Sequence, residues 1–166
     1  MHFGVGGNER KRLGEAFELA LLRGLVAGGA TVLLARGVSA AELEQTARLT
    51  TVLRQDGAVV LDLPAGGALD PLAAAGQAPN VVTWQADSGA FCALVEASDL
   101  YLGYDSAGQH VAAAAGTPAV TLFVTSAGRR HLRRWSPHGR HARVLAVPPG
   151  ADEQAAAASV LRLIVS

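Results

Sequence analysis

Residues 99–123 read DLYLGYDSAGQHVAAAAGTPAVTLF, and this stretch decides the fold. An apolar run at residues 100–104 gives way at Asp105 to an alanine-rich segment, which stops at Gly116. A second apolar run follows at residues 119–123. Glycine commonly ends a helix, and a proline shortly after it prevents the helix from continuing. The stretch therefore predicts a strand, a helix and a second strand.

The start of the predicted helix is a candidate anion-binding site. The first backbone N–H groups of a helix lack partners within it and attract anions, and Gly108 leaves room beside them. Asp105 or Ser106 can cap this helix, and Ser106 and His110 are four residues apart, so they share one face. Two interpretations remain open. Asp105 and His110 are either a cap and a surface residue, or groups that bind a phosphate or sugar.

Along the rest of the chain, short apolar runs alternate with segments of helical periodicity. Asp87 or Ser88 and Asp152 are suited to cap two of the helices, and residues 64–79 are looser, with room for one helical turn. Strands are expected at residues 3–6, 31–35, 59–63, 81–82 and 144–145, and helices around residues 17–25, 43–50, 91–98 and 157–164. This alternation predicts an α/β fold with a doubly wound parallel sheet covered on both faces. The length favours one domain over residues 1–166.

Composition excludes several classes of protein. Half of the residues are hydrophobic, 17% are charged and the formal net charge is zero, so disorder is not expected and the overall charge indicates no partner. Cys92 is the only cysteine, which excludes an internal disulfide and a cysteine-rich metal site. It lies in an apolar helical pattern, where we expect a buried thiol. No apolar run approaches the roughly 18 residues of a membrane span, and the first residues lack a signal-peptide pattern. We therefore expect a soluble, cytoplasmic protein.

In doubly wound sheets, ligands bind at the carboxyl ends of the strands. One such loop begins with GVGGN at residues 4–8. It lacks the third glycine of the dinucleotide motif G-x-G-x-x-G, because Glu9 takes that place, so we exclude a nicotinamide enzyme. Lys11, the only lysine in the chain, lies in the same loop. It is either a phosphate ligand or a solvated charge.

A basic segment follows the central stretch. No Asp or Glu occurs between Asp105 and Asp152, and within this interval lie Arg129, Arg130, His131, Arg133, Arg134, His138, Arg140, His141 and Arg143. Such a patch is either a solvent-exposed face without a ligand or a binding surface. Its ligand would then be a diphosphate, a second domain, an anionic membrane surface or nucleic acid. Trp135 is its only aromatic residue suited to stacking on bases, so we do not expect nucleic acid to be the ligand.

Three motifs, in order, resemble glycosyltransferase family 9, the heptosyltransferases of lipopolysaccharide synthesis. Residues 105–118, DSAGQHVAAAAGTP, are similar to the family's D-[ST]-G-x-x-H-x-x-A-A-x-G-T-P. The segment KRLG at residues 11–14, followed by Phe17, is similar to K-x-W-P-x-x-x-[FW]. Residues 134–139, RWSPHG, are similar to R-W-x-P-[YH]-G. The agreement extends over nearly the whole chain.

The resemblance implies the C-terminal, Rossmann-like half of a two-domain GT-B glycosyltransferase. That half binds the nucleotide sugar, typically ADP-heptose, and by this resemblance we expect the N-terminal acceptor domain to lie outside residues 1–166. The segment from residue 84 to residue 87 would lie near the adenine. Carried over by position, the substrate-binding residues would be Lys11 at the diphosphate, Ser106, Ala107 and Gly108 as hydrogen-bond donors to it, and Asp105 and His110 in the phosphate and sugar region.

Such enzymes invert the anomeric centre by direct displacement, without a metal or other cofactor. Their general base is a carboxylate of the N-terminal domain. We therefore expect no catalytic residue in this chain and no sugar transfer by the chain alone. The expected partners are a nucleotide-diphosphate sugar and an N-terminal acceptor domain or subunit, with at most peripheral membrane contact and no nucleic acid.

Several positions depart from the family pattern. Ala107 replaces a glycine, LG at residues 13–14 replaces Trp-Pro, FVTS at residues 123–126 replaces F-G-P-T, and no carboxylate is evident near Ser39 after the second expected strand. These departures favour an alternative, a non-catalytic interaction or remnant domain that kept the fold and lost the ligand. A third hypothesis is an anion or nucleic-acid binder that uses the arginines.

Overall fold

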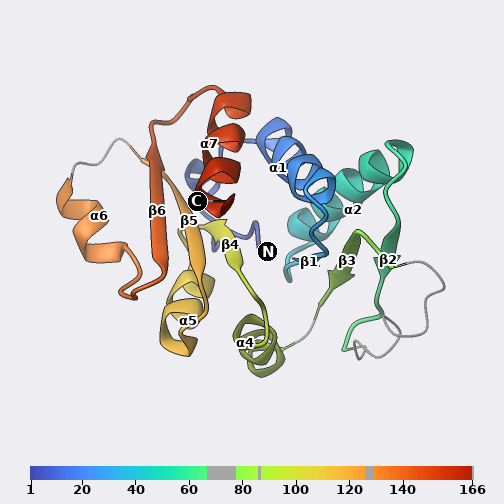
Figure 1. The fold of residues 1–166 in the computed structure, drawn as a ribbon, viewed down its shortest axis with the longest axis horizontal. Helices are drawn as coiled ribbons and strands as arrows, with labels where there is room; N and C mark the ends of the chain where they lie inside the picture. Colours follow the sequence, from blue (N-terminus) through green and yellow to red (C-terminus); the bar gives the residue numbers. More distant parts are fainter. Residues whose placement is uncertain (67–77, 86, 126–128, 166) are drawn as a thin grey trace.

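The computed structural model describes residues 1–66, 78–85, 87–125 and 129–165. In this part of the chain the strands form two parallel three-stranded sheets, in the orders β2-β3-β1 and β4-β5-β6 (Figure 1). The strands are β1 (Val32–Ala35), β2 (Val60–Asp62), β3 (Val81–Trp84), β4 (Tyr101–Tyr104), β5 (Ala119–Val124) and β6 (Ala142–Val147).

His2 joins the two sheets. It forms isolated parallel bridges to Ala35 of β1 and to Gly103 of β4. The strand predicted at residues 3–6 is wrong, because the backbone leaves the sheet after His2. The two large apolar side chains of that segment are nevertheless buried in the core. The apolar pattern there reflects burial rather than strand pairing.

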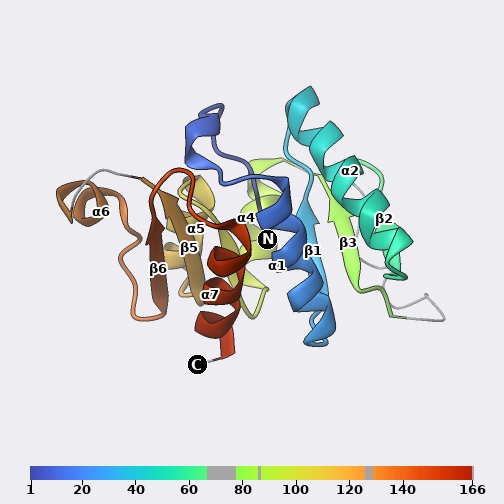
Figure 2. The ribbon, with the colours of Figure 1, turned by 90° about the horizontal axis from the view of Figure 1, so that it is seen from above.

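Helices cover both faces of the sheets (Figures 1 and 2). Helices α1, α2 and α7 lie on one face and α4 and α5 on the other, while α6 lies at the outer edge beside β6. The predicted doubly wound α/β class is therefore confirmed. The helices are η1 (Glu9–Lys11, a 3-10 turn), α1 (Glu15–Ala27), α2 (Ala40–Gln55), α4 (Ser88–Glu96), α5 (Ala107–Ala115), α6 (Arg129–Trp135) and α7 (Glu153–Val165).

The described residues form three hydrophobic clusters, and Phe91 of α4 packs against the two smaller ones. The largest one packs Phe17 and Leu22 of α1 and Val160 of α7 against the strands. On the opposite face, a smaller cluster includes Tyr101 of β4 and Ala112 of α5. Every residue of β3, β4 and β5 is buried, as expected for parallel strands covered on both faces.

Two predicted helix caps are confirmed. Asp87 Oδ1 accepts a hydrogen bond from the N–H of Ala90 at 2.8 Å, and Asp152 Oδ1 accepts one from the N–H of Ala155 at 2.7 Å. The expected burial of Cys92 is wrong, because its side chain is exposed on α4. The helical turn expected within residues 64–79 falls mostly on residues 67–77, outside the described residues.

Candidate functional site

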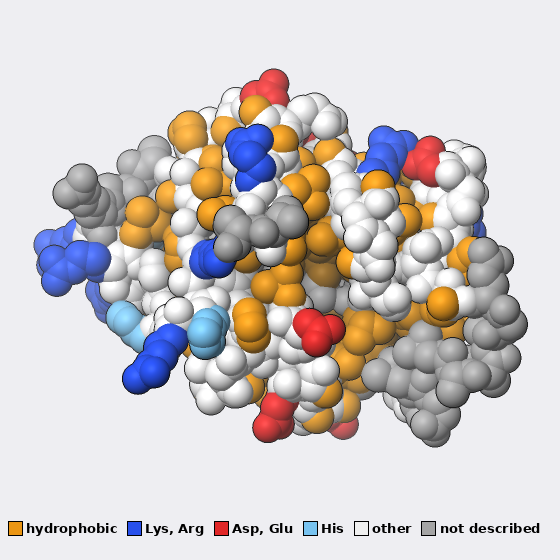
Figure 3. Space-filling view, viewed as in Figure 1, with side chains coloured by type: hydrophobic (Ala, Val, Ile, Leu, Met, Phe, Trp, Pro, Cys, Tyr) orange, Lys and Arg blue, Asp and Glu red, His pale blue; other side chains and the backbone are white. Residues whose placement is uncertain are grey.

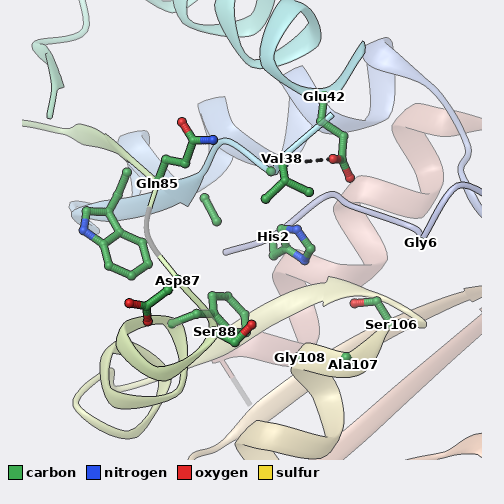
Figure 4. A pocket seen from close by; sticks show the side chains of 14 residues that line it. His2, Gly6, Val38, Glu42, Gln85, Asp87, Ser88, Ser106, Ala107 and Gly108 are labelled. Atoms are coloured by element: carbon green, nitrogen blue, oxygen red, sulfur yellow. Dashed lines mark hydrogen bonds between the residues drawn. The ribbon is translucent and has the colours of Figure 1, made fainter. Parts of the chain in front are cut away.

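A pocket of about 330 Å³ lies at the carboxyl ends of β1, β3 and β4 (Figure 4). We call it the α4–α5 pocket, because the first residues of these two helices form part of its wall. It is lined by His2, Gly6, Ala35, Gly37, Val38, Glu42, Trp84, Gln85, Asp87, Ser88, Phe91, Ser106, Ala107 and Gly108. Its position is the one expected for a ligand site in a doubly wound sheet.

Part of the pocket wall is apolar. Trp84 at the end of β3 is only 5% exposed, whereas Val38 after β1 is 81% exposed, and Phe91 of α4 adds a second ring. Apolar walls that open to solvent are suited to a flat ring system. The segment expected near an adenine, residues 84–87, lies here, although residue 86 is outside the described residues.

Glu42 brings a carboxylate to this pocket. It is the third residue of α2 and forms a capping box with Ser39. Its Oε2 accepts a hydrogen bond from the N–H of Val38 at 3.1 Å (Figure 4). It accepts another from the N–H of Ser39 at 3.0 Å. Burial raises the pKa of Glu42, but these hydrogen bonds outweigh burial and hold the pKa below its ordinary value. Burial lowers the pKa of the neighbouring His2 below its ordinary value, which favours the neutral ring.

The start of α5 forms the opposite part of the wall, with Ser106, Ala107 and Gly108. The predicted side-chain cap is absent, because Ser106 makes no capping hydrogen bond to the first turn of α5. The backbone N–H groups of the first turn are thus left without a side-chain acceptor. Gly108 also has a packing role, since a Cβ there would collide with Tyr101 Oη.

Lys11 and Asp105 meet beside this helix start. Lys11 Nζ lies 2.9 Å from Asp105 Oδ2 and donates to the Asp105 carbonyl oxygen at 3.2 Å. Asp105 Oδ1 accepts a hydrogen bond from Gln109 Nε2 at 2.7 Å. His110 is exposed, with its Nε2 3.5 Å from the same Gln109 nitrogen. Lys11, Asp105 and His110 do not line the α4–α5 pocket itself.

A buried ion pair anchors the loop that carries Lys11. The Glu18 carboxylate of α1 is fully buried and pairs with Arg12, the residue after Lys11. The Gln45 amide of α2 also donates to this carboxylate. Burial raises the pKa of Glu18 to about 7, against the lowering effect of the Arg12 guanidinium. Glu18 and Gln45 both belong to helices of the core. Their network with Arg12 therefore fixes the position of the loop that carries Lys11.

The basic segment forms an exposed surface, the basic surface, over α6 and the turn before β6 (Figure 3). Trp135 is 45% exposed and lies under Arg134, whose Cζ is 5.3 Å from the ring centre. The Trp135 carbonyl accepts a hydrogen bond from Gln109 Nε2 at 3.2 Å, which ties α6 to α5. The exposed members of the basic surface are Arg130, Arg133, Arg134, His138, Arg140, His141 and Arg143.

Two classes of feature are missing from the described part of the chain. Its His, Cys, Asp and Glu side chains form no group of three or more that could hold a metal ion. None of the helices within residues 1–66, 78–85, 87–125 and 129–165 is both long and apolar enough to cross a bilayer.

Sequence reasoning missed Glu42, Gln109 and Glu18. The spacing Ser39-x-x-Glu42 is a capping-box pattern, which could have placed the Glu42 carboxylate near the end of β1. Gln109 and Glu18 had no such signal, because their roles depend on partners that the fold brings together.

Comparison with known families supports the expected resemblance. Residues 87–159 match the model of glycosyltransferase family 9 (heptosyltransferase). The matched region runs from the start of α4 into α7, and it contains two of the three sequence motifs, at residues 105–118 and 134–139. No curated protein matches the chain.

Comparison with solved structures confirms the fold. The E. coli heptosyltransferase WaaC with ADP is similar with a TM-score of 0.70 and 17% sequence identity. The alignment covers 99% of this chain and 42% of that one. The same E. coli enzyme with ADP-2-deoxy-2-fluoro heptose is similar with a TM-score of 0.63 and 14% identity, covering 99% and 41% of the two chains. The chain therefore has the fold of one part of these heptosyltransferases and spans less than half of their length.

Proposed function

Because residues 87–159 match the model of glycosyltransferase family 9, we propose that this chain is the donor-binding domain of an inverting GT-B glycosyltransferase. The donor is a nucleoside-diphosphate sugar, with ADP-heptose as the first candidate. One observation carries the proposal. The α4–α5 pocket joins an apolar wall to an uncapped helix start, and the only lysine of the chain lies beside that start.

The diphosphate occupies the helix start in this proposal. The N–H groups of Ala107 and Gly108 and the hydroxyl of Ser106 are donors suited to phosphate oxygens. The Lys11 ammonium adds a positive charge, and its side chain is 34% exposed, so a ligand can reach it. When the sugar is transferred, negative charge builds up on the departing diphosphate, and a fixed cation stabilises it.

The nucleoside occupies the rest of the α4–α5 pocket. Trp84, Phe91 and Val38 offer the apolar walls that a purine ring requires. The Glu42 carboxylate is an acceptor for ribose hydroxyl groups. Glu42 lies in the first turn of α2, close to Ser39, where the family pattern has a carboxylate. The ADP of the similar E. coli WaaC structure supports adenine as the first base to test.

The acceptor and the general base belong to a second domain or subunit in this proposal. The chain spans less than half of the heptosyltransferases that it resembles, and in such enzymes a carboxylate of the other half activates the acceptor hydroxyl. We therefore expect the chain to bind the donor and to transfer no sugar by itself. The basic surface is a candidate contact for that second half.

Calorimetric titration and thermal shift with ADP, UDP, GDP and ADP-heptose test the proposal. A ligand that binds only the folded state, at 100 times its Kd, stabilises by about 2.7 kcal/mol and raises the melting temperature in a concentration-dependent way. We expect ADP and ADP-heptose to stabilise most. Absence of any shift at millimolar concentration would contradict donor binding.

A second candidate is an interaction domain that kept the fold and lost the ligand. It is favoured by Ala107, which replaces the family's glycine, and by the Asp105 carboxylate, which already neutralises Lys11. A tight ADP complex that depends on Lys11 would exclude this candidate. Failure of all four nucleotides would favour it.

A further inference from the structure

We infer that Gln109 is a positioning residue, which holds the Asp105 carboxylate in place when a ligand phosphate draws the Lys11 ammonium away from it. This inference rests on the proposed nucleotide-binding function and adds a residue to it. Gln109 belongs to none of the fixed positions of the sequence motifs, and its contacts alone point to the role.

Gln109 is the third residue of α5, and its side chain is completely buried. Its Nε2 donates to Asp105 Oδ1 at 2.7 Å and to the Trp135 carbonyl oxygen at 3.2 Å. Both neighbours are acceptors, so they require the amide nitrogen, rather than the oxygen, on this side. The amide oxygen is buried without a hydrogen-bond partner among the described residues. A buried polar atom without a partner is unfavourable, and the two hydrogen bonds that Nε2 donates offset this cost.

The Asp105 carboxylate is divided between two partners. Oδ2 pairs with Lys11 Nζ, while Oδ1 accepts from Gln109. The Asp105 side chain is only 10% exposed, so little water reaches it. The Lys11 ammonium makes two contacts with Asp105, an ion pair with the carboxylate and a hydrogen bond to the carbonyl oxygen. The Lys11 ammonium is more exposed than the Asp105 carboxylate. An anion that arrives from solvent can therefore compete with Asp105 for it.

A bound phosphate competes with Asp105 for Lys11, because charged hydrogen bonds to phosphate and to carboxylate are similar in strength. As the Lys11 ammonium turns to the phosphate, the negative charge of the poorly hydrated Asp105 carboxylate is less well neutralised. An uncompensated buried charge is costly. The Gln109 N–H remains on Oδ1 and limits this cost. Without it, Asp105 retains Lys11 more strongly and the phosphate binds less well.

The test uses the folded chain and compares Gln109→Met with the wild type. Methionine keeps the volume and removes both the donor and the unpartnered oxygen. Affinities for ADP, inorganic pyrophosphate and adenosine are measured by calorimetry. Lys11 is the only lysine, so [13Cε]-lysine labelling gives one NMR signal that reports its environment during each titration. Gln55→Met, at the exposed end of α2, is the matched control.

We expect Gln109→Met to bind ADP and pyrophosphate about ten-fold more weakly, as is typical for loss of one hydrogen bond to a charged group. The Lys11 signal then moves at about ten times the pyrophosphate concentration that the wild type requires. Adenosine affinity, which involves no phosphate, stays the same. In an Asp105→Asn background the Gln109→Met effect disappears, because no carboxylate charge is left to stabilise.

Three results would overturn the inference. Gln109→Met could bind pyrophosphate as well as the wild type, lose adenosine and ADP equally, or lose as much affinity in the Asp105→Asn background. If the wild type itself binds neither ADP nor pyrophosphate, the proposed function fails and the inference fails with it. If the wild type binds both and only the variant comparison disagrees, the inference alone is wrong.

Discussion

Arg12 and Glu18 form a two-pronged ion pair inside the protein, with Arg12 Nη2 2.7 Å from Glu18 Oε1 and 2.9 Å from Oε2. Arg12 directly follows Lys11, so this pair fixes the loop from which Lys11 reaches Asp105. The Tyr104 hydroxyl accepts a hydrogen bond from the N–H of Leu13 at 3.4 Å, which attaches the same loop to the end of β4. A buried polar network of Arg12, Glu18 and Tyr104 thus holds the loop from which Lys11 reaches Asp105.

This network makes stability depend on pH. Burial raises the pKa of Glu18 from 4.5 to about 7 in the folded protein. The folded state therefore binds this proton more tightly than the unfolded state does. The resulting stabilisation is complete below pH 4.5 and is lost as the pH rises through 7. Glu18→Gln cannot titrate, so between pH 5 and 8 the wild type should lose on the order of 2–3 kcal/mol relative to this variant.

Urea unfolding of both proteins at several pH values measures this difference. Glu15→Gln, an exposed carboxylate on the same helix, is the control and should follow the wild-type profile. Parallel profiles for the wild type and Glu18→Gln would show that Glu18 stays charged throughout this range.

Lys11→Ala should weaken ADP binding roughly ten- to a hundred-fold, because a hydrogen bond to a charged group contributes on the order of 1.5–3 kcal/mol. The fold should persist, since the Lys11 side chain is partly exposed and core packing does not depend on it. Calorimetry gives the affinity and circular dichroism checks the fold. Arg10→Ala removes an exposed neighbouring cation and should change affinity little. Equal losses in the two variants would indicate a general charge effect rather than a phosphate contact.

Gly108→Ala should lower the free energy of unfolding by roughly 1–3 kcal/mol, the usual cost of forcing an extra carbon into a packed region. A Cβ at this position would lie 2.6 Å from Tyr101 Cζ as well as colliding with the hydroxyl. Thermal or urea unfolding measures the loss. At Gly139 the nearest atom to an added Cβ is 3.7 Å away, so Gly139→Ala is the control and should stay within about 0.5 kcal/mol of wild type. A stable Gly108→Ala would mean that Tyr101 can move aside.

Local sequence signals predicted the central unit of the fold well. The run 100–104, the alanine-rich helix and Gly116, which ends the helix with a positive φ of 76°, lie close to their predicted places. The predictions failed where the same apolar pattern is compatible with two structures, such as a paired strand or an unpaired buried segment. Residues 3–6 are apolar because they enter the core without pairing, and Cys92 lies on a helix whose outer side is also apolar. Helix α6 was missed because its arginine-rich sequence has no apolar period.

The candidate site was only partly predictable for a different reason. The motif residues indicated where to look, but Lys11 and Asp105 are 94 positions apart and no spacing rule brings them together. Whether Asp105 faces a ligand or a lysine depends on how the first loop packs against β4. Gln109 likewise becomes informative only when the fold places its amide between Asp105 and the Trp135 carbonyl.

Glu42→Gln tests whether the pocket carboxylate recognises ribose. If Glu42 accepts a hydrogen bond from the 2′-hydroxyl, the variant should bind ADP several-fold more weakly while its affinity for 2′-deoxy-ADP changes little, so the preference for ribose shrinks. Ser39→Ala separates this effect from the capping box, because loss of the cap costs about 1 kcal/mol of stability without removing the carboxylate. That control should melt earlier and keep its preference for ADP over 2′-deoxy-ADP. Parallel calorimetric titrations with the two nucleotides give the ratio, and an unchanged ratio in Glu42→Gln would place the ribose away from this carboxylate.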